Sequence, residues 1–396
     1  MDNSLWSSLP KPMQEQFFNL ADTETKKTKK RLLSDTNKLK QISSQIKLHK
    51  TPVSESWKNW SIACVDGSDS PVINQTLGSR YGLYGACIMM FKGDQFLPNS
   101  EEYKSGKLVL DQIGSSDDFQ KILRLIMIYN ERKLAVSKLN EVDLMIIDGS
   151  FFGWRVGCST IKHLLLPYEN ITNVSQLIDE LGKLSKILLE SKKVIAVVKR
   201  VSTGAINGWI KFKGWDNLCV NQNDKMILSS IMPNNTFFSY SDFFQSKHED
   251  RKKLNFNFYS LLNNHSFTKQ KISDNLIWAA QRSFEQVRKD VNPDIADSVF
   301  STDRYYVKSS QYPPCCIEVP QNFENISDLL SYVVSNTNPG TGLPFPIDLT
   351  DSNVTIPSGL TQEFVEEVEA QLLKDNTLDL SDISNHFSRL NPQKNE

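Results

Sequence analysis

Residues 142–150 read VDLMIIDGS, a mostly apolar run followed by the triplet Asp-Gly-Ser. Such runs are typical of a central strand that is buried on both faces of a sheet. The run Trp60–Val65 is followed by the same triplet, and in both cases the glycine predicts a tight turn after the aspartate. If the two strands are neighbours, Asp66 and Asp148 lie at the same edge of one sheet.

The segments around these two runs predict an α/β fold. Between them we expect two further strands and then a helix, and after them a helix and another buried strand. The order of three strands, helix, strand, helix, strand predicts a mixed sheet flanked by helices. The segments are Tyr81–Phe91 and Leu108–Ile113 (strands), Asp118–Leu139 (helix), Leu177–Leu189 (helix) and Val194–Val198 (strand).

Glu131 adds a third carboxylate to the two aspartates. The predicted helix around it is apolar almost all round, so a carboxylate there is costly unless it is paired or bound to a metal. One interpretation is a structural ion pair with Arg124 or Lys138. The other is convergence with Asp66 and Asp148, because three carboxylates suit Mg²⁺ or Mn²⁺, and two such ions promote phosphodiester hydrolysis.

Further residues are candidates for contacting a phosphate chain. Lys199 follows the strand Val194–Val198, where it either holds a phosphate or is simply a lysine at a strand end. The run from Arg304 to Lys308 mixes basic and aromatic side chains, which suits single-stranded DNA, although an edge strand with solvated charges explains it equally well. Arg124, Arg304, Tyr305 and Lys308 are the candidate DNA-binding residues.

The charges are unevenly distributed along the 396 residues, although the formal net charge is only −1. Lys26–Lys50 holds nine Lys or Arg residues against one Asp, in a segment with helical spacing, and the segment near 362–382 is acidic. A basic arm can follow phosphates and an acidic helix can meet a basic partner, but both are equally consistent with solvated helix faces. We expect a helical arm over 1–55, the main domain over 56–356, and an acidic helix and tail over 357–396.

The composition of the chain indicates the cellular compartment in which we expect the protein. No apolar run approaches the length of a membrane helix, and the start of the chain does not resemble a signal peptide. The six cysteines have neither zinc-ligand spacing nor the pattern of a disulfide framework, so we expect a cytoplasmic protein.

The second half of the chain has weaker signals. We expect two strands within Tyr305–Val319 and a helix over Ile326–Val334, with Leu276–Val291 as an amphipathic helix. GWIKFKGW at 208–215 alternates like a hairpin, and 339–356 is rich in loop residues.

Seven motifs resemble the NurA family of nucleases, in the family's order. They cover roughly residues 60–356 and imply an RNase H-like core, formed by about 60–213 with a C-terminal part at about 276–356. The motifs are VDGSDSP (65–71), NER (130–132), IIDGS (146–150), VVKRVS (197–202), YYVK (305–308), IEVP (317–320) and GLPFPIDLTD (342–351).

The resemblance implies a Mn²⁺-dependent deoxyribonuclease, with Mg²⁺ as the alternative metal and two ions in the site. It also implies 5′-to-3′ exonuclease and single-strand endonuclease activity, a homodimer, and a HerA-type hexameric ATPase as partner in DNA end resection and double-strand break repair in the nucleoid. Asp66, Glu131 and Asp148 match the metal-binding carboxylates, and Asp351 stands at the position that closes the site. Leu343 replaces a tyrosine of the family pattern.

Two other functions fit the same residues. One is a non-catalytic DNA-binding or scaffold subunit on an RNase H-like core, which loss of a metal ligand would favour. The other is a phage-defence nuclease of the same fold.

Overall fold

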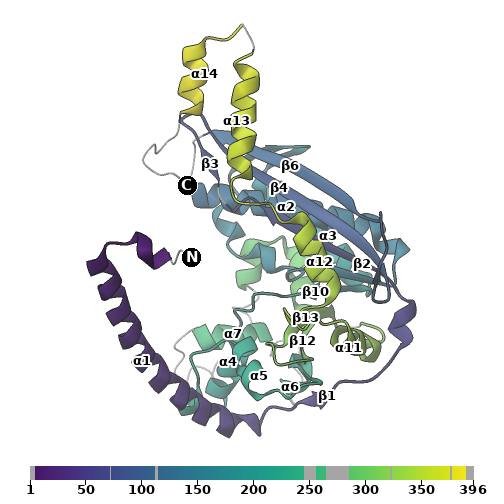
Figure 1. The fold of residues 1–396 in the computed structure, drawn as a ribbon. Coiled ribbons are helices and arrows are strands. Elements are labelled where there is room, and N and C mark those ends of the chain that lie inside the picture. Colours follow the sequence, from purple (N-terminus) through teal and green to yellow (C-terminus); the bar gives the residue numbers. More distant parts are fainter. Residues whose placement is uncertain are drawn as a thin grey trace.

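The computed structural model describes residues 5–71, 73–111, 115–244, 256–264, 285–321, 323–374 and 377–388. Within these ranges a mixed sheet of eleven strands forms the centre of the molecule (Figure 1). Its order is β1-β11-β12-β13-β10-β7-β2-β4-β3, and β5 and β6 also pair with β4. The strands are β1 (His49–Lys50), β2 (Ser61–Asp69), β3 (Asn74–Gln75), β4 (Ser79–Lys92), β5 (Gln95–Phe96), β6 (Glu102–Asp111), β7 (Leu144–Asp148), β10 (Val194–Val197), β11 (Thr236–Ser239), β12 (Thr302–Lys308) and β13 (Cys315–Pro320). A separate pair is formed by β8 (Leu165–Tyr168) and β9 (Ile171–Asn173).

Three parallel strands, β2, β7 and β10, lie side by side in the middle of this sheet. Val65 of β2 is in register with Ile147 of β7, and Asp148 of β7 with Val197 of β10. Parallel neighbours need crossover connections, and helices α2 (Ser116–Lys138) and α3 (Val174–Glu190) supply them. The predicted α/β fold with a mixed sheet flanked by helices is therefore confirmed.

Helices cover both faces of the three central strands. α2 and α3 pack on the face that carries Val65 and Ile147. α11 (Ile326–Ser335) and α12 (Phe345–Val354) pack on the opposite face, with Cys64 and Ile146. Because successive strand residues point to opposite faces, Asp66 and Asp148 both belong to the α12 face.

A second helical layer packs beside β11 and β12, where its aromatic and aliphatic side chains form a core of their own. Its helices are α4 (Ala205–Phe212), α5 (Asp224–Ile231), α6 (Tyr240–Phe243) and α7 (Phe256–Asn264), and α10 (Pro293–Ala296) packs near α3.

The N-terminal arm is one long helix, α1 (Lys11–Ser43), which runs away from the sheet (Figure 1). Its C-terminal end is anchored by Leu39 and Ile42, which are buried in the core shared with α5. The apolar residues nearer its start, such as Phe17 and Leu20, are exposed. The arm is therefore held at one end only, within the described residues.

At the other terminus, α13 (Leu360–Leu372) and α14 (Leu380–Phe387) lie side by side (Figure 1). Val365, Ile383 and Phe387 pack on Tyr81 of β4 and form a small core there.

Two sequence predictions in the second half are wrong. The expected hairpin at 208–215 is mostly helix α4, because its apolar residues lie on one helical face that packs into the core. The expected loop at 339–356 contains helix α12, which begins after Pro344 with Pro346 in its first turn, where proline is tolerated. The predicted helix 276–291 lies mostly outside the described residues. None of the described helices is both long and apolar enough to cross a membrane.

Candidate active site

Asp66 and Asp148 lie next to each other at the centre of the sheet, as their motifs predict. Asp66 is inside β2 and almost fully buried, whereas Asp148 ends β7 and is partly buried. Burial and the charge of Asp148 raise the pKa of Asp66 well above its usual range. The two strands therefore bring two carboxylates together at a cost that a nearby cation, or a proton on Asp66, offsets.

The two glycines that follow these aspartates have different structural roles. Gly149 has a φ of +71°, so the chain turns there in a conformation that favours glycine. Gly67 continues β2 without a turn, contrary to the prediction. A Cβ on Gly67 would lie 2.1 Å from Met127 Sδ, so the lack of a side chain there lets Met127 of α2 pack against the sheet.

Glu131 lies on α2, is buried, and interacts electrostatically with Asp66 and Asp148. Its ion-pair partner is Arg132, whose Nη1 lies 2.6 Å from Glu131 Oε1, and not Arg124 or Lys138 as the structural alternative required. Burial raises the pKa of Glu131 to about 7, with Arg132 lowering it and Asp148 raising it. Arg132 Nη2 also donates to the carbonyl oxygens of Asp148 and Ser150, at 3.3 and 3.4 Å. Arg132 thus joins the two elements that carry Glu131 and Asp148.

Lys199 lies among the aspartates. Its Nζ is 2.9 Å from Asp66 Oδ2, 3.3 Å from Asp148 Oδ1 and 2.5 Å from Asp351 Oδ1. Burial alone would lower the pKa of this ammonium, but Asp66 and Asp148 raise it above its usual value. Lys199 therefore stays charged and gathers carboxylates from three elements.

Asp351 approaches from helix α12, in the segment expected to be loop. Its side chain is 54% exposed, against 2% for Asp66, so it forms the solvent side of the cluster. Leu343 precedes α12 and packs against the core on that face of the sheet.

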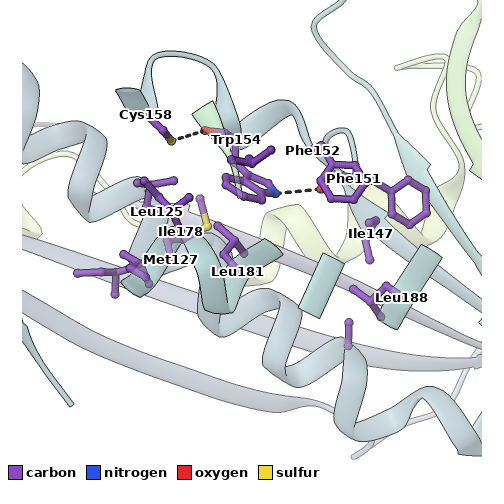
Figure 2. Close-up of a cluster of buried hydrophobic side chains, with 14 of the residues drawn as sticks. Leu125, Met127, Ile147, Phe151, Phe152, Trp154, Cys158, Ile178, Leu181 and Leu188 are labelled. Carbon is purple, nitrogen blue, oxygen red and sulfur yellow. Dashed lines mark hydrogen bonds between the residues drawn. The ribbon is translucent and has the colours of Figure 1, made fainter. Parts of the chain in front are cut away.

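The chain after Asp148 is fixed by polar and apolar contacts. Ser150 Oγ donates to Glu318 of β13 at 3.0 Å, and Arg304 Nε donates to the same carboxylate at 2.8 Å. After Ser150, Phe151 and Trp154 pack in the core with residues of α2 and α3. Trp154 Nε1 donates to the Phe151 carbonyl at 2.9 Å (Figure 2). The turn that presents Asp148 is thereby held from both sides.

The candidate DNA-binding residues differ in exposure. Arg304 is buried in its ion pair with Glu318, and Lys308 is buried with its Nζ donating to the Ser229 carbonyl at 2.7 Å. Tyr305 is half-buried, while its neighbour Tyr306 is fully buried, in line with opposite faces of a strand. Arg124 has a 60% exposed side chain, 3.4 Å from Asp69.

Sequence reasoning missed Arg132 and Glu318. The sequence did contain an indication of the role of Arg132, because this residue directly follows a glutamate on a helix that is apolar almost all round. Glu318 carried a weaker one, as a charged residue in the middle of the apolar strand β13. Arg132 also contacts Asp148 and Ser150, and Glu318 contacts Ser150, and spacing does not reveal such distant contacts.

The donor set suits a divalent cation. When all are ionised, four carboxylates and two cations give the cluster a net charge of −2. They are Asp66, Glu131, Asp148 and Asp351, with Lys199 and Arg132. Their oxygens are ligands that Mg²⁺ and Mn²⁺ favour. Asp148 Oδ1 is buried and accepts no hydrogen bond, although Lys199 Nζ lies 3.3 Å away.

The carboxylates are nevertheless not arranged as a ready ligand set. Within the described ranges no three His, Cys, Asp or Glu side chains have the spacing of a metal site. The charged group that lies among the aspartates is Lys199. The residues fit a metal by their chemistry, and their side chains have to rearrange to hold one.

Comparison with known proteins gives the same assignment as the motifs. A family model described as "NurA domain" matches residues 61–356. The chain is similar in structure to the NurA nuclease from Sulfolobus solfataricus, with a TM-score of 0.56 and 11% identity over 93% of this chain and 98% of that one. No curated protein matches it.

Two further solved structures are more distant. A NurA with manganese has a TM-score of 0.48 at 12% identity, over 89% of this chain and 99% of that one. A NurA bound to dAMP and manganese has a TM-score of 0.49 at 12% identity, over 95% of this chain and 99% of that one. Because the family model covers well over half of the sequence, from β2 to the end of α12, the chain belongs to the NurA family.

Proposed function

We propose that this chain is a metal-dependent deoxyribonuclease that hydrolyses DNA phosphodiesters at the cluster of Asp66, Glu131 and Asp148. The observation that carries the proposal is that the buried Asp66 and Glu131 and the partly buried Asp148, from β2, α2 and β7, interact electrostatically in a NurA-family chain. Both aspartates and the glutamate are present, which favours catalysis over a scaffold role. Burial of the Asp66 and Glu131 carboxylates is costly unless a cation compensates it.

Asp66, Glu131 and Asp148 are the proposed ligands of two ions, Mn²⁺ or Mg²⁺, and Asp351 is a fourth ligand or an acid beside them. Ions held there supply Lewis-acid stabilisation of phosphate oxygens and lower the pKa of water. The protein's own contribution is to hold the carboxylates together, with Asp66 and Glu131 away from bulk water. Lys199 supplies a cation for a phosphate oxygen, and Arg132 and Glu318 hold Glu131 and the Asp148 turn in place.

We propose a DNA path that uses exposed cations. Arg124 and the basic segment of α1 around Lys26–Arg31 are exposed and suited to phosphate contact. Tyr305 is a candidate for stacking on a base. For Arg304 we propose a structural role in holding Glu318, which supports the site without contacting DNA.

The resemblance to the family also supports finer proposals. These are 5′-to-3′ exonuclease and single-strand endonuclease activity, a homodimer, and action with a HerA-type hexameric ATPase in DNA end resection and break repair in the nucleoid. The acidic face of α13, with Glu363, Glu366 and Glu367 exposed, fits a basic partner surface. A phage-defence role would use the same chemistry.

The test is cleavage of end-labelled DNA by the purified chain, alone and with the ATPase. Mn²⁺-dependent cleavage that is lost in Asp66→Asn supports the proposal, and a chain that stays inactive even with the ATPase overturns it. The labelled end that is released first reports the polarity.

A further inference from the structure

Lys199 contacts the same carboxylates that the proposed function assigns to the metal. Its ammonium touches Asp66 Oδ2, Asp148 Oδ1 and Asp351 Oδ1, at 2.9, 3.3 and 2.5 Å. These atoms come from β2, β7 and α12, so one cation already bridges the elements that build the site. A second positive charge a few ångströms away would be repelled strongly in this partly buried setting.

We propose that Lys199 competes with the divalent cation for Asp66 and Asp148, so that metal binding requires its ammonium to withdraw. This inference rests on the proposed function. It adds that the position of the Lys199 side chain determines whether the metal can bind. Lys199 balances the aspartates before metal arrives. On withdrawal, its charge becomes free to meet a phosphate oxygen of the DNA.

The backbone around Lys199 is held by hydrogen bonds, while its side chain is partly exposed to solvent. Val198 N donates to the Cys316 carbonyl at 2.8 Å, and Lys225 Nζ donates to the Lys199 carbonyl at 3.2 Å. The Lys199 side chain itself is 25% exposed, and the more exposed Asp351 lies on its solvent side. The withdrawn ammonium therefore keeps Asp351 as a partner after it leaves Asp66 and Asp148.

The direction of the effect separates competition from a purely structural or phosphate-binding role. If Lys199 only held phosphate, its removal would leave metal affinity unchanged in the absence of DNA. If it only supported the fold of the site, its removal would weaken metal binding. Competition alone predicts that removing the lysine tightens metal binding, because Asp66 and Asp148 then lack their cation.

The experiment is calorimetric titration of the full chain with Mn²⁺ in the absence of DNA. We expect Lys199→Met to bind Mn²⁺ at least fivefold more tightly than wild type, and Lys199→Arg, which keeps the charge, to bind like wild type. Lys193→Met is the matched control, since Lys193 precedes the same strand, β10, at its opposite end and donates to the Val142 carbonyl. Equal or weaker binding by Lys199→Met overturns the inference.

A second measurement uses the wild-type chain and does not depend on any variant folding. Labelling with an amine-reactive reagent, read by mass spectrometry, reports how well each lysine is shielded by its contacts. We expect Mn²⁺ to raise the labelling rate of Lys199 several-fold and to leave Lys193 unchanged. An unchanged or lower rate at Lys199 overturns the inference.

These outcomes distinguish the inference from the proposed function. A wild type that cleaves DNA with Mn²⁺, while Lys199→Met binds Mn²⁺ no more tightly, overturns competition alone. A wild type that neither binds Mn²⁺ nor cleaves DNA overturns both.

Discussion

The ammonium of Lys199 lies 2.9 Å from Asp66 Oδ2, although 133 positions separate the two residues in the chain. Asp66 is on β2 and Lys199 follows β10, with β7 between the two strands. The contact therefore forms only when all three parallel strands are in place. The site is a product of the completed sheet, and each of its charges depends on partners that other elements supply.

Removing the guanidinium of Arg132 should destabilise the fold. Arg132→Met leaves Glu131 buried without its partner, and we expect a loss of about 3 kcal/mol in the free energy of unfolding, measured in urea. Arg124→Met is the control, because its pair with Asp69 is exposed on the arginine side and should cost less than about 1 kcal/mol. Equal effects of the two substitutions would contradict the assigned pair.

The two glycines should respond to alanine for different reasons. Gly67→Ala forces Met127 to move and should cost about 1 kcal/mol, since the thioether is flexible. Gly149→Ala meets no neighbour within 4 Å but must adopt a left-handed conformation, which costs about 1–2 kcal/mol. In a double-mutant cycle, Met127→Ala should reduce the cost of Gly67→Ala and leave that of Gly149→Ala unchanged. Additive effects at both sites would refute the steric explanation for Gly67.

Metal binding should depend on pH. Burial raises the pKa of Glu131 to about 7, so this carboxyl is mostly protonated at pH 6 and mostly ionised at pH 8. A cation binds the ionised form, and binding below pH 7 must therefore release protons. We expect Mn²⁺ affinity to rise from pH 6 to pH 8, and calorimetry in buffers of different ionisation enthalpy should count more protons released at pH 6. Release near zero at both values would argue against Glu131 as a ligand.

The basic segment of α1 should set the salt dependence of DNA binding. Replacing Lys26, Lys27, Lys29 and Lys30 by alanine leaves the anchoring residues Leu39 and Ile42 intact. If all four lysines contact duplex phosphates, the slope of log affinity against log salt should fall by about 0.9 for each of them. Fluorescence anisotropy at several salt concentrations measures this slope. An unchanged slope would make these lysines solvated surface charges.

The carboxylates of the site were predictable because backbone rules place them. An apolar run followed by Asp-Gly-Ser predicts a strand end, and parallel strands present their ends at one edge, so Asp66 and Asp148 were expected to meet. Gly67 shows the limit of that reasoning. The same dipeptide serves a turn at Gly149 and close helix packing at Gly67, and only the position of α2 distinguishes them.

The partners of the carboxylates were harder to predict. Arg132 and Glu318 are defined by contacts with the Asp148–Ser150 turn, and no local pattern encodes those contacts. Helix α12 was hidden by its composition, since prolines at its start read as loop signals when the helix is short. Asp351 was therefore placed by family resemblance, and its helix came from the structure.

The most direct test of the central claim is cleavage of end-labelled single- and double-stranded DNA in Mn²⁺, Mg²⁺ or EDTA, with and without the HerA-type ATPase. The comparison is between wild type, Asp66→Asn and Asp143→Asn, whose carboxylate accepts from Ser61 N at the far end of the sheet from the site. We predict metal-dependent cleavage by wild type and Asp143→Asn, and a loss in Asp66→Asn at least as large as the roughly 10- to 100-fold that loss of an outer-shell partner costs. Cleavage by Asp66→Asn at the wild-type rate would contradict the account.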